Sequence, residues 1–505
     1  MFKQKLEKKP WLIKSTCTAL LTSLLVACGS SSDDSGVGYV KFYNASSNAP
    51  DIIFTVDEDL ETSETDAVEI TYNGLGYGEA LSYAQYPSAS YFYELAWQDD
   101  DSSERSELAI IDQGPLEITE DTMHFVVIDN DVQLAQVSVY QYPMIADDDD
   151  DTYDLFNLRV LNSQEVPLDV YYSKTDETFN EAILFDTANY QTLLENQKLE
   201  QGSYIFYLTA SGDTDVVFES EEVAFSYSAQ YLMAIRENPS NSQSPYLMDR
   251  ISNTAIVALS DVNAQAQVSF YNAIGLADEY FPEYQGEVDV YLQGTDNDPV
   301  AQAIAIGQYT ESVVNENGDF SLDVLISGQN QSLLKNHLLS LPENSAKTVF
   351  LYGDEEYVDE DGDGDVDEDG DGQVDEIEFT VHSLVVDNSQ LTGLYSHQVM
   401  LVNLIDDELY SAVNAYFVRS SETITTADNK LAAGYADTDS LTLNNNTYEV
   451  YLTAKDNSSD VILASFEMIL DETSSNQFLV IEEDDNSPTG FSATLLAQHL
   501  LTNSE

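Results

Sequence analysis

The sequence predicts an all-β protein built from tandem sandwich domains, and three observations lead to that fold class. Short alternating runs rich in Val, Ile, Tyr, Phe and Thr are separated by Asn, Asp, Gly and Ser, which is typical of half-buried strands and turns. No stretch longer than about three helical turns has an apolar stripe at helical spacing. The same ordered set of strands also recurs four times along the 505 residues, which indicates an internal repeat.

Each repeat opens with an apolar strand that ends in asparagine, a residue suited to the turn that follows. The four opening strands are 40–44, 158–162, 268–272 and 399–403. A second strand starts near Asp51, Asp169, Asp289 and Asn414. A third starts at Tyr91, Tyr204, Phe320 and Tyr448, and a fourth near Phe125, Tyr231, Thr348 and Phe478. The near-constant spacing predicts four copies of one unit.

A unit of roughly 100–130 residues has the length of an immunoglobulin-like sandwich, so we expect four such domains in tandem. The expected division of the chain is 1–27 signal peptide, 28–37 tether, 38–146 repeat 1, 147–154 acidic linker, 155–262 repeat 2, 263–394 repeat 3 with an insertion at 354–378, and 395–505 repeat 4. The five consecutive aspartates at 147–151 contain no glycine, and we interpret them as a solvated, self-repelling linker.

The N-terminus has the order of features found in a lipoprotein signal. Five lysines precede an apolar stretch at 18–27 that is too short for a permanent membrane helix, and Leu-Val-Ala-Cys-Gly follows at 25–29 before a polar tether. This resembles the lipobox of bacterial lipoproteins, which implies cleavage before Cys28 and acylation of that cysteine. Because Gly29 replaces the aspartate that retains enteric lipoproteins in the inner membrane, the resemblance implies a lipid anchor in the outer membrane, on the periplasmic side or the cell surface.

The amino-acid composition indicates which kinds of partner the protein can bind and whether disulfides can stabilise it. The formal net charge of −75 disfavours nucleic acid and anionic lipid as partners, whereas 43% hydrophobic residues are enough for packed cores. Such acidity suits either a saline habitat or simply a soluble surface. The only other cysteine, Cys17, leaves with the signal peptide, so the mature domains must be stable without disulfides.

An acidic segment at 358–376 alternates carboxylates with glycines and predicts a calcium site. Calcium loops of the EF-hand kind place oxygen ligands at positions 1, 3, 5, 7, 9 and 12, with glycine at position 6. One register meets every position, with Gly372 at position 6 and the ligands Asp367, Asp369, Asp371, Gln373 through its carbonyl, Asp375 and Glu378. An earlier register lacks the final glutamate but supplies Asp359, Asp361, Asp363 and Asp365, and shares Asp367. We expect one or two structural Ca²⁺ ions; the alternative is an ordinary acidic loop.

A family resemblance appears in the first repeat. The stretch Asn-Ala-Ser-Ser-Asn-Ala-Pro at 44–50, the strand at 51–54, the Tyr-Gly pair at 77–78 and the strand at Tyr91 resemble the bacterial immunoglobulin-like domain catalogued as domain of unknown function 4397. The other repeats keep the strand pattern and lose the turn. The resemblance implies a sandwich fold and a cell-envelope setting, and it implies no activity.

No arrangement of residues points to an enzyme. The five histidines are scattered, without a zinc-protease, nucleophile-elbow or cysteine-protease pattern, and His124 and His382 fall in or beside predicted strands. We therefore expect a non-enzymatic protein for structure, adhesion or contact with envelope proteins. The alternative is a carbohydrate-binding surface lipoprotein, because 32 tyrosines could form sugar-binding platforms. Core packing offers a competing explanation for those on repeat-defining strands, namely Tyr43, Tyr91, Tyr93, Tyr171, Tyr291 and Tyr448.

Overall fold

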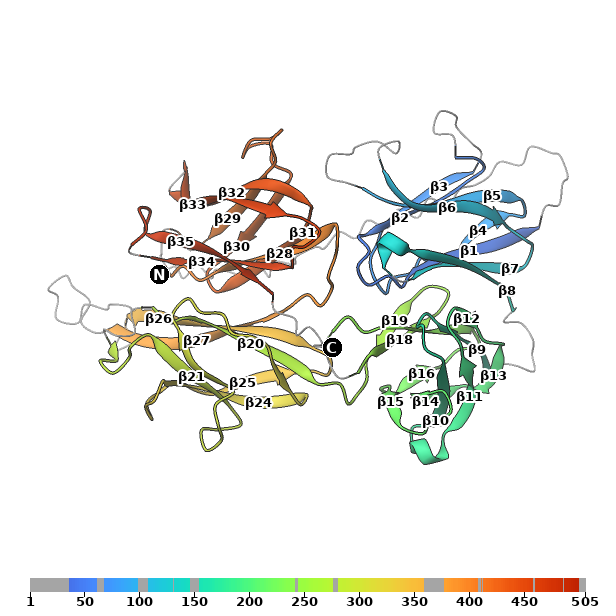
Figure 1. Cartoon of the computed structure of the whole chain (residues 1–505), viewed down its shortest axis with the longest axis horizontal. Helices are drawn as coiled ribbons and strands as arrows, with labels where there is room; N and C mark the ends of the chain where they lie inside the picture. The colour runs from blue at the N-terminus through green and yellow to red at the C-terminus, as the bar shows by residue number, and fades with distance from the viewer. Residues whose placement is uncertain are drawn as a thin grey trace, which may run out of the picture. The chain divides into compact units, whose positions relative to one another are not determined.

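The computed structural model describes residues 36–60, 68–98, 108–129, 131–145, 154–240, 244–275, 280–357, 377–406, 410, 412–456, 459–484 and 486–498. These residues form strands in every repeat and two short 3₁₀ helices, η2 (Val132–Leu134) and η3 (Phe179–Glu181). None of the helices in this described part is long and apolar enough to cross a membrane. The chain is an all-β protein of tandem immunoglobulin-like sandwiches in four repeats (Figure 1).

Repeat 1 shows the plan that the other repeats follow. Its first sheet has the order β4 (Ala84–Pro87), β1 (Val37–Asn44), β7 (Thr122–Asp129), β8 (Gln136–Pro143). Its second sheet has the order β3 (Glu69–Leu75), β2 (Ile52–Asp57), β5 (Ser90–Trp97), β6 (Ala109–Glu117). The pairs are antiparallel except β1 and β7, which run parallel. The opening strand pairs with a strand 84 residues later in the chain, as in Asn44 with Ile128.

Repeat 2 has more and shorter edge strands. Its first sheet holds β12 (Thr192–Leu193), β13 (Gln197–Glu200), β9 (Leu155–Asn162), β17 (Gln230–Glu237), β18 (Tyr246–Ile251) and β19 (Ile256–Leu259). Its second sheet holds β11 (Ile183–Ala188), β10 (Leu168–Lys174), β14 (Gly202–Ala210), β15 (Val216–Glu219) and β16 (Val223–Phe225). Strands β9 and β17 form the parallel pair.

Repeats 3 and 4 return to two four-stranded sheets each. In repeat 3 the sheets are β23 (Val313–Asn315), β20 (Ala266–Ala273), β26 (Ala346–Tyr357), β27 (Ile377–Asp387), and β22 (Ala301–Ala305), β21 (Glu287–Leu292), β24 (Gly318–Ile326), β25 (Ser332–Leu341). In repeat 4 they are β31 (Asp437–Asn444), β28 (Ser396–Asn403), β34 (Gln477–Glu483), β35 (Phe491–Ala497), and β30 (Asn429–Ala433), β29 (Val413–Val418), β32 (Asn446–Asp456), β33 (Ser459–Leu470).

The asparagine that ends each opening strand is a buried crosslink. Asn44, Asn162, Asn272 and Asn403 are all 0% exposed. In each case Oδ1 accepts a hydrogen bond of 2.8–3.1 Å from the backbone N–H two residues later. The Nδ2 group donates to a backbone carbonyl elsewhere in the same repeat, at 2.8–3.2 Å. The predicted turn role is confirmed, and the side chain also ties two segments of the sandwich together.

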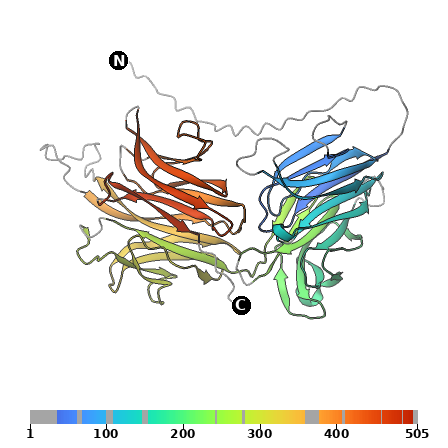
Figure 2. The same ribbon diagram turned by 45° about the horizontal axis from the view of Figure 1, so that its top comes forward.

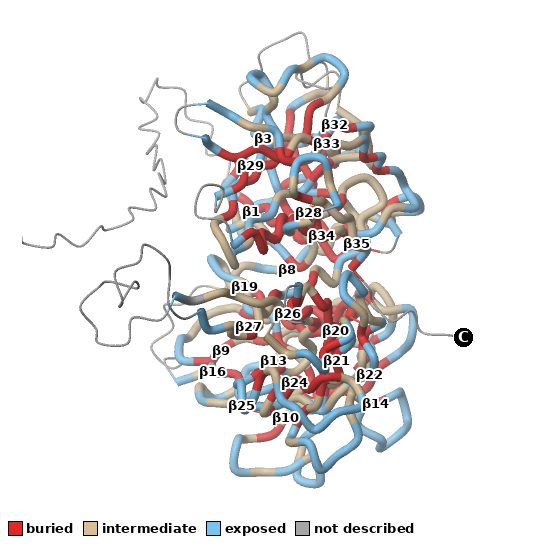
Figure 3. The backbone as a smooth tube through the Cα atoms, turned by 90° about the vertical axis from the view of Figure 1, so that its left-hand side faces the viewer, coloured by how far each residue is buried: buried red, intermediate tan, exposed pale blue. Residues whose placement is uncertain are grey.

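Each repeat has its own apolar core. Figure 2 shows the backbone layers of the repeats from a second side. Alternate residues of the opening strand point into the core, such as Val40 and Phe42 in repeat 1, and Phe42 stacks on Phe54 of the facing sheet with ring centroids 5.0 Å apart. In Figure 3 the buried segments follow the central strands of each sheet. Burial of these alternating apolar faces is the main source of stability for sandwiches that have no disulfide.

Two further apolar clusters join the repeats in pairs, which the sequence did not predict. The outward side of β1 and β7 packs against repeat 2 through Tyr43, Ala45, Met123, Phe125, Val127, Leu161, Leu232, Ala234 and Ile251. The corresponding side of β20 and β26 packs against repeat 4 through Tyr271, Phe350, Val386, Val402, Leu404, Phe478 and Val480. We call repeats 1 and 2 the first lobe and repeats 3 and 4 the second lobe. Their parallel strand pairs are buried on both faces.

Candidate functional site: the acidic hairpin of repeat 3

Strands β26 and β27 form the hairpin that flanks the acidic segment, as the repeat alignment predicted. Their antiparallel register runs without a bulge from Lys347↔Asp387 to Tyr357↔Ile377. Strand β26 has 12 residues, whereas the equivalent strands β7, β17 and β34 have 8, 8 and 7. Leu351 pairs with Asn272, the asparagine that ends the opening strand of repeat 3. The β26–β27 ladder continues six residues past Leu351. Tyr357 and Ile377, the described residues that flank the acidic segment in the sequence, are therefore paired with each other.

The hairpin is braced on one side by an aromatic group. Phe379 on β27 lies over Gly353 on β26, so closely that a Cβ at Gly353 would overlap its ring. Tyr280 stacks on Phe379 with ring centroids 5.1 Å apart, and the Tyr280 hydroxyl donates to Glu355 at 2.9 Å. Glycine at 353 is thus explained by the close approach of an aromatic ring. These contacts brace strand β26 at Glu355 and strand β27 at Phe379, each three residues from the acidic segment in the sequence.

Of the predicted calcium ligands, Glu378 lies within the described residues. It is exposed on β27, and its backbone pairs with that of Glu356 on β26, one pair before the end of the ladder. Asp359, Asp361, Asp363, Asp365, Asp367, Asp369, Asp371, Gln373 and Asp375 lie outside the described residues, as does Cys28. Among the residues that are described, no group of three or more His, Cys, Asp or Glu side chains is arranged to hold a metal ion.

Burial, together with neighbouring carboxylates, raises the pKa of two acids close to the hairpin, Asp406 and Glu482. Partial burial, a hydrogen bond to Asp354 and repulsion from Asp354 and Glu483 raise the pKa of Asp406 to about 7. Burial and the charge of Asp484 raise the pKa of Glu482, which accepts a 2.9 Å hydrogen bond from Tyr271. His382 lies beside these acids, with its Nε2 3.9 Å from an Asp354 carboxylate oxygen. Excess carboxylate of this kind favours protons or cations as counter-charges.

At the interface of the first lobe, by contrast, the buried carboxylate of Asp249 is paired with a cation, the guanidinium of Arg236. Arg236 donates to Asp249 through Nε at 2.7 Å and through a terminal nitrogen at 3.1 Å, and Tyr43 donates to the same carboxylate at 2.6 Å. The Arg236 guanidinium also lies over the Tyr77 ring, 4.3 Å from its centroid. Burial raises the pKa of Tyr77 to about 12. No local sequence pattern reveals this group, because the two tyrosines of repeat 1 lie more than 150 residues before Arg236 and Asp249 of repeat 2.

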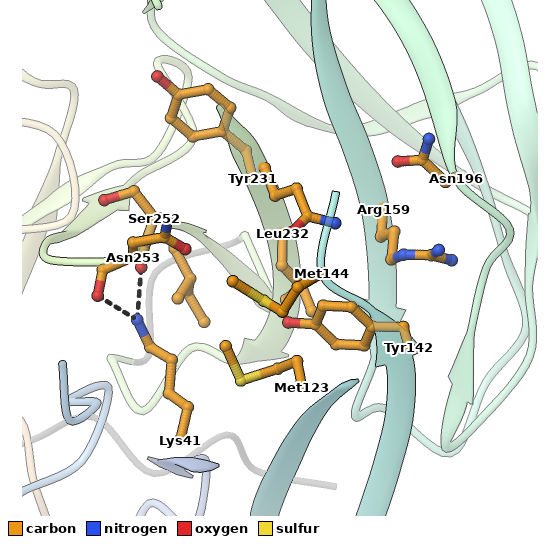
Figure 4. A pocket seen from close by; sticks show the side chains of 12 residues that line it. Lys41, Met123, Tyr142, Met144, Arg159, Asn196, Tyr231, Leu232, Ser252 and Asn253 are labelled. Atoms are coloured by element: carbon orange, nitrogen blue, oxygen red, sulfur yellow. Dashed lines mark hydrogen bonds between the residues drawn. The ribbon is translucent and has the colours of Figure 1, made fainter. Parts of the chain in front are cut away.

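A small cavity lies beside this interface (Figure 4). Lys41, Met123, Tyr142 and Arg159 are among its lining residues, and Lys41 donates to the carbonyl oxygens of Ser252 and Asn253. Burial lowers the pKa of Lys41 to about 8. The enclosed space is about 20 Å³, room for about one water molecule. We therefore assign this cavity to packing between the repeats and not to substrate binding.

Several tyrosines proposed as core residues have other roles. Tyr91, Tyr93 and Tyr448 are buried in their own sandwiches, as expected. Tyr171 on β10 and Tyr291 on β21 are half-buried and belong to none of the buried clusters described above, so strand propensity and not core packing accounts for them. Tyr43 is buried between repeats 1 and 2 because it points away from its own core.

Trp97, and the two histidines that the sequence puts in or beside strands, have structural partners. Trp97 stacks on Tyr395 with ring centroids 4.8 Å apart, which occupies one face of its ring. His124 lies on β7, fully buried, with Nδ1 3.2 Å from the Tyr39 carbonyl, and His382 lies on β27 stacked on Tyr352. Both histidines thus lie on strands, as the sequence predicted.

Comparisons with known proteins give only distant structural likenesses. No family model matches the chain, and no curated protein matches it. Among solved structures, the Bacillus anthracis TIE protein matches 90% of this chain and 75% of its own at 7% identity with a TM-score of 0.14. The major pilin subunit BcpA of Bacillus cereus matches 65% and 99% at 10% identity, with a TM-score of 0.13. Two B repeat units of the Staphylococcus aureus collagen-binding protein match 91% and 98% at 8% identity, with a TM-score of 0.12.

Proposed function

We propose that the protein is a non-enzymatic lipoprotein of the outer membrane that displays four sandwich domains, with a calcium-ordered hairpin on the third. Its role is adhesion, envelope architecture or contact with envelope proteins. The observation that supports the proposal is the β26–β27 ladder, which pairs Tyr357 with Ile377 on either side of the calcium-loop sequence and includes Glu378. The lipobox at Cys28 supplies the anchor.

The available side chains suit calcium. Carboxylate oxygens and one backbone carbonyl are hard ligands that Ca²⁺ accepts in sets of six to eight, whereas Mg²⁺ requires a tighter octahedron and gives up its water reluctantly. Asp354 and Glu483 already repel the ionised form of Asp406 beside the hairpin. A bound cation would offset that repulsion and the repulsion within the acidic segment. Calcium would thus order the hairpin tip and would take no part in a reaction.

Scanning calorimetry of the whole protein in detergent, with and without calcium, tests this role. At a hundredfold excess of calcium over its dissociation constant, binding adds about 2.7 kcal/mol to the folded state. We expect the transition of the second lobe to rise by roughly 5–10 °C and that of the first lobe to stay in place.

Two double variants separate a built site from general charge. Asp367→Ala with Glu378→Gln removes two ligands of the complete register and should abolish the calcium shift. Asp147→Ala with Asp149→Ala removes two charges from an acidic run that lacks the glycine spacing, and should leave the shift intact. Equal shifts in both variants, or an equal shift with magnesium, would contradict the proposal.

A further inference from the structure

Asp129 is a buried carboxylate at the interface of repeats 1 and 2, and its partners carry no charge. It is the last residue of β7 and is 2% exposed. Gln191 of repeat 2 donates its side-chain amide to both carboxylate oxygens, at 3.2 Å each, and to Gln136 on β8 at 2.9 Å. The amide group is therefore shared among several acceptors, and each bond is long for a carboxylate.

The position in repeat 2 that is equivalent to Asp129 is Arg236, and its charge is paired with Asp249. Asp129 follows Ile128, which pairs with Asn44 at the end of the opening strand of repeat 1. Arg236 likewise follows Ile235, which pairs with Asn162 at the end of the opening strand of repeat 2. Arg236 faces the Asp249 carboxylate, whereas the groups facing Asp129 are the amides of Gln136 and Gln191 and the phenols of Tyr140 and Tyr190. One end of the interface thus has an ion pair, and among the described residues the other end has a carboxylate without a cation.

We propose that Asp129 makes the interface of the first lobe sensitive to pH, so that repeats 1 and 2 are held together most firmly when this carboxyl group is protonated. An ionised carboxylate loses its hydration when repeat 2 covers it, and amide hydrogen bonds replace that hydration only in part. A protonated carboxyl group carries a much smaller desolvation cost. Separation of the repeats exposes the ionised form to water, so ionisation favours separation.

The pH range follows from the direction of the shift. Burial raises the pKa of Asp129 from 3.8 to about 6, against a smaller lowering by the Gln191 hydrogen bond. Because the covered form binds its proton more tightly than the exposed form, the contribution is complete below pH 4 and is lost as pH rises through about 6. Two pKa units correspond to at most about a hundredfold change in the equilibrium between closed and open repeats.

Hydrogen exchange of the full chain, read by mass spectrometry, tests the proposal. Peptides covering β7 and β17 report opening of the interface, and rates are corrected for the intrinsic pH dependence of exchange. Between pH 5 and pH 8, at constant salt, we expect protection in these peptides to fall by about tenfold. Asp129→Asn keeps the size of the side chain and stays neutral, so its protection should be equal at both pH values. Glu165→Gln, an exposed site in repeat 2, removes one charge and should retain the full fall.

The outcomes are distinct. Loss of the pH dependence in Asp129→Asn alone supports the proposal. A fall of equal size in the wild type and Asp129→Asn would assign the pH effect to general repulsion among the many carboxylates and overturn it. No fall in the wild type would overturn it as well.

Discussion

Removal of the Asp249 side chain should weaken the first lobe more than any other single truncation at its interface. The Asp249 side chain is 0% exposed and that of Arg236 is 7% exposed. Asp249→Ala leaves a buried guanidinium without its counter-charge and the Tyr43 hydroxyl without its acceptor. Loss of one partner of a buried ion pair costs about 3–5 kcal/mol. Tyr43→Phe removes one hydrogen bond to a charged group and should cost about 1.5–3 kcal/mol.

Urea unfolding at pH 7 and constant salt measures both effects. We expect Asp249→Ala to lower the unfolding midpoint of the first lobe by about twice as much as Tyr43→Phe, with the second lobe unchanged. The double variant Arg236→Met with Asp249→Leu should recover most of the loss, because apolar side chains of similar volume remove the buried charges together. A cost below about 1 kcal/mol for Asp249→Ala, or no recovery in the double variant, would refute the view that this buried ion pair of repeat 2 stabilises the contact with repeat 1.

Three further variants test other parts of the structure. Asn272→Ala removes the side-chain hydrogen bonds to the Ile274 N–H and the Ile304 carbonyl, so it should lower the unfolding free energy of the second lobe by about 2–3 kcal/mol. An effect confined to the first lobe would contradict the assigned crosslink. Gly353→Val should displace Phe379 and speed hydrogen exchange in β26 and β27, whereas unchanged exchange would show that the ring does not brace the hairpin. Cys28→Ala should abolish lipidation and release the protein from membranes, as judged by mass spectrometry and fractionation. Membrane retention equal to that of the wild type would contradict the proposal that Cys28 carries the lipid anchor.

The repeating strands were predictable because each leaves a local pattern. Alternation in 40–44 and its counterparts marks one face toward the core, and the asparagine at the end marks the turn. The hairpin around 358–376 followed from the alignment of repeats alone, and the ladder from Lys347 to Tyr357 confirms it. Short edge strands such as β12 and β23, with two and three residues, are set by pairing with β9 and β20 and leave little pattern of their own.

The pairing of repeats could be seen only in three dimensions. Tyr43 and Lys41 occupy the positions that ordinarily face solvent on a half-buried strand, yet repeat 2 covers both. One sequence signal was present. The consecutive apolar residues of 125–128 predict a strand buried on both faces, which a single sandwich does not require. Which surface covers the second face depends on contacts between distant residues such as Tyr43 and Asp249, and no local pattern encodes them.

Isothermal titration of calcium into the purified full chain tests the central claim most directly. The account predicts binding of one or two Ca²⁺ ions, with a dissociation constant of roughly 10⁻⁴–10⁻³ M and weaker competition by magnesium. Asp367→Ala with Glu378→Gln should lose this binding, and Asp147→Ala with Asp149→Ala should keep it. No heat of binding in the millimolar range, or equal binding by both double variants, would show that the acidic hairpin of repeat 3 is an ordinary charged loop.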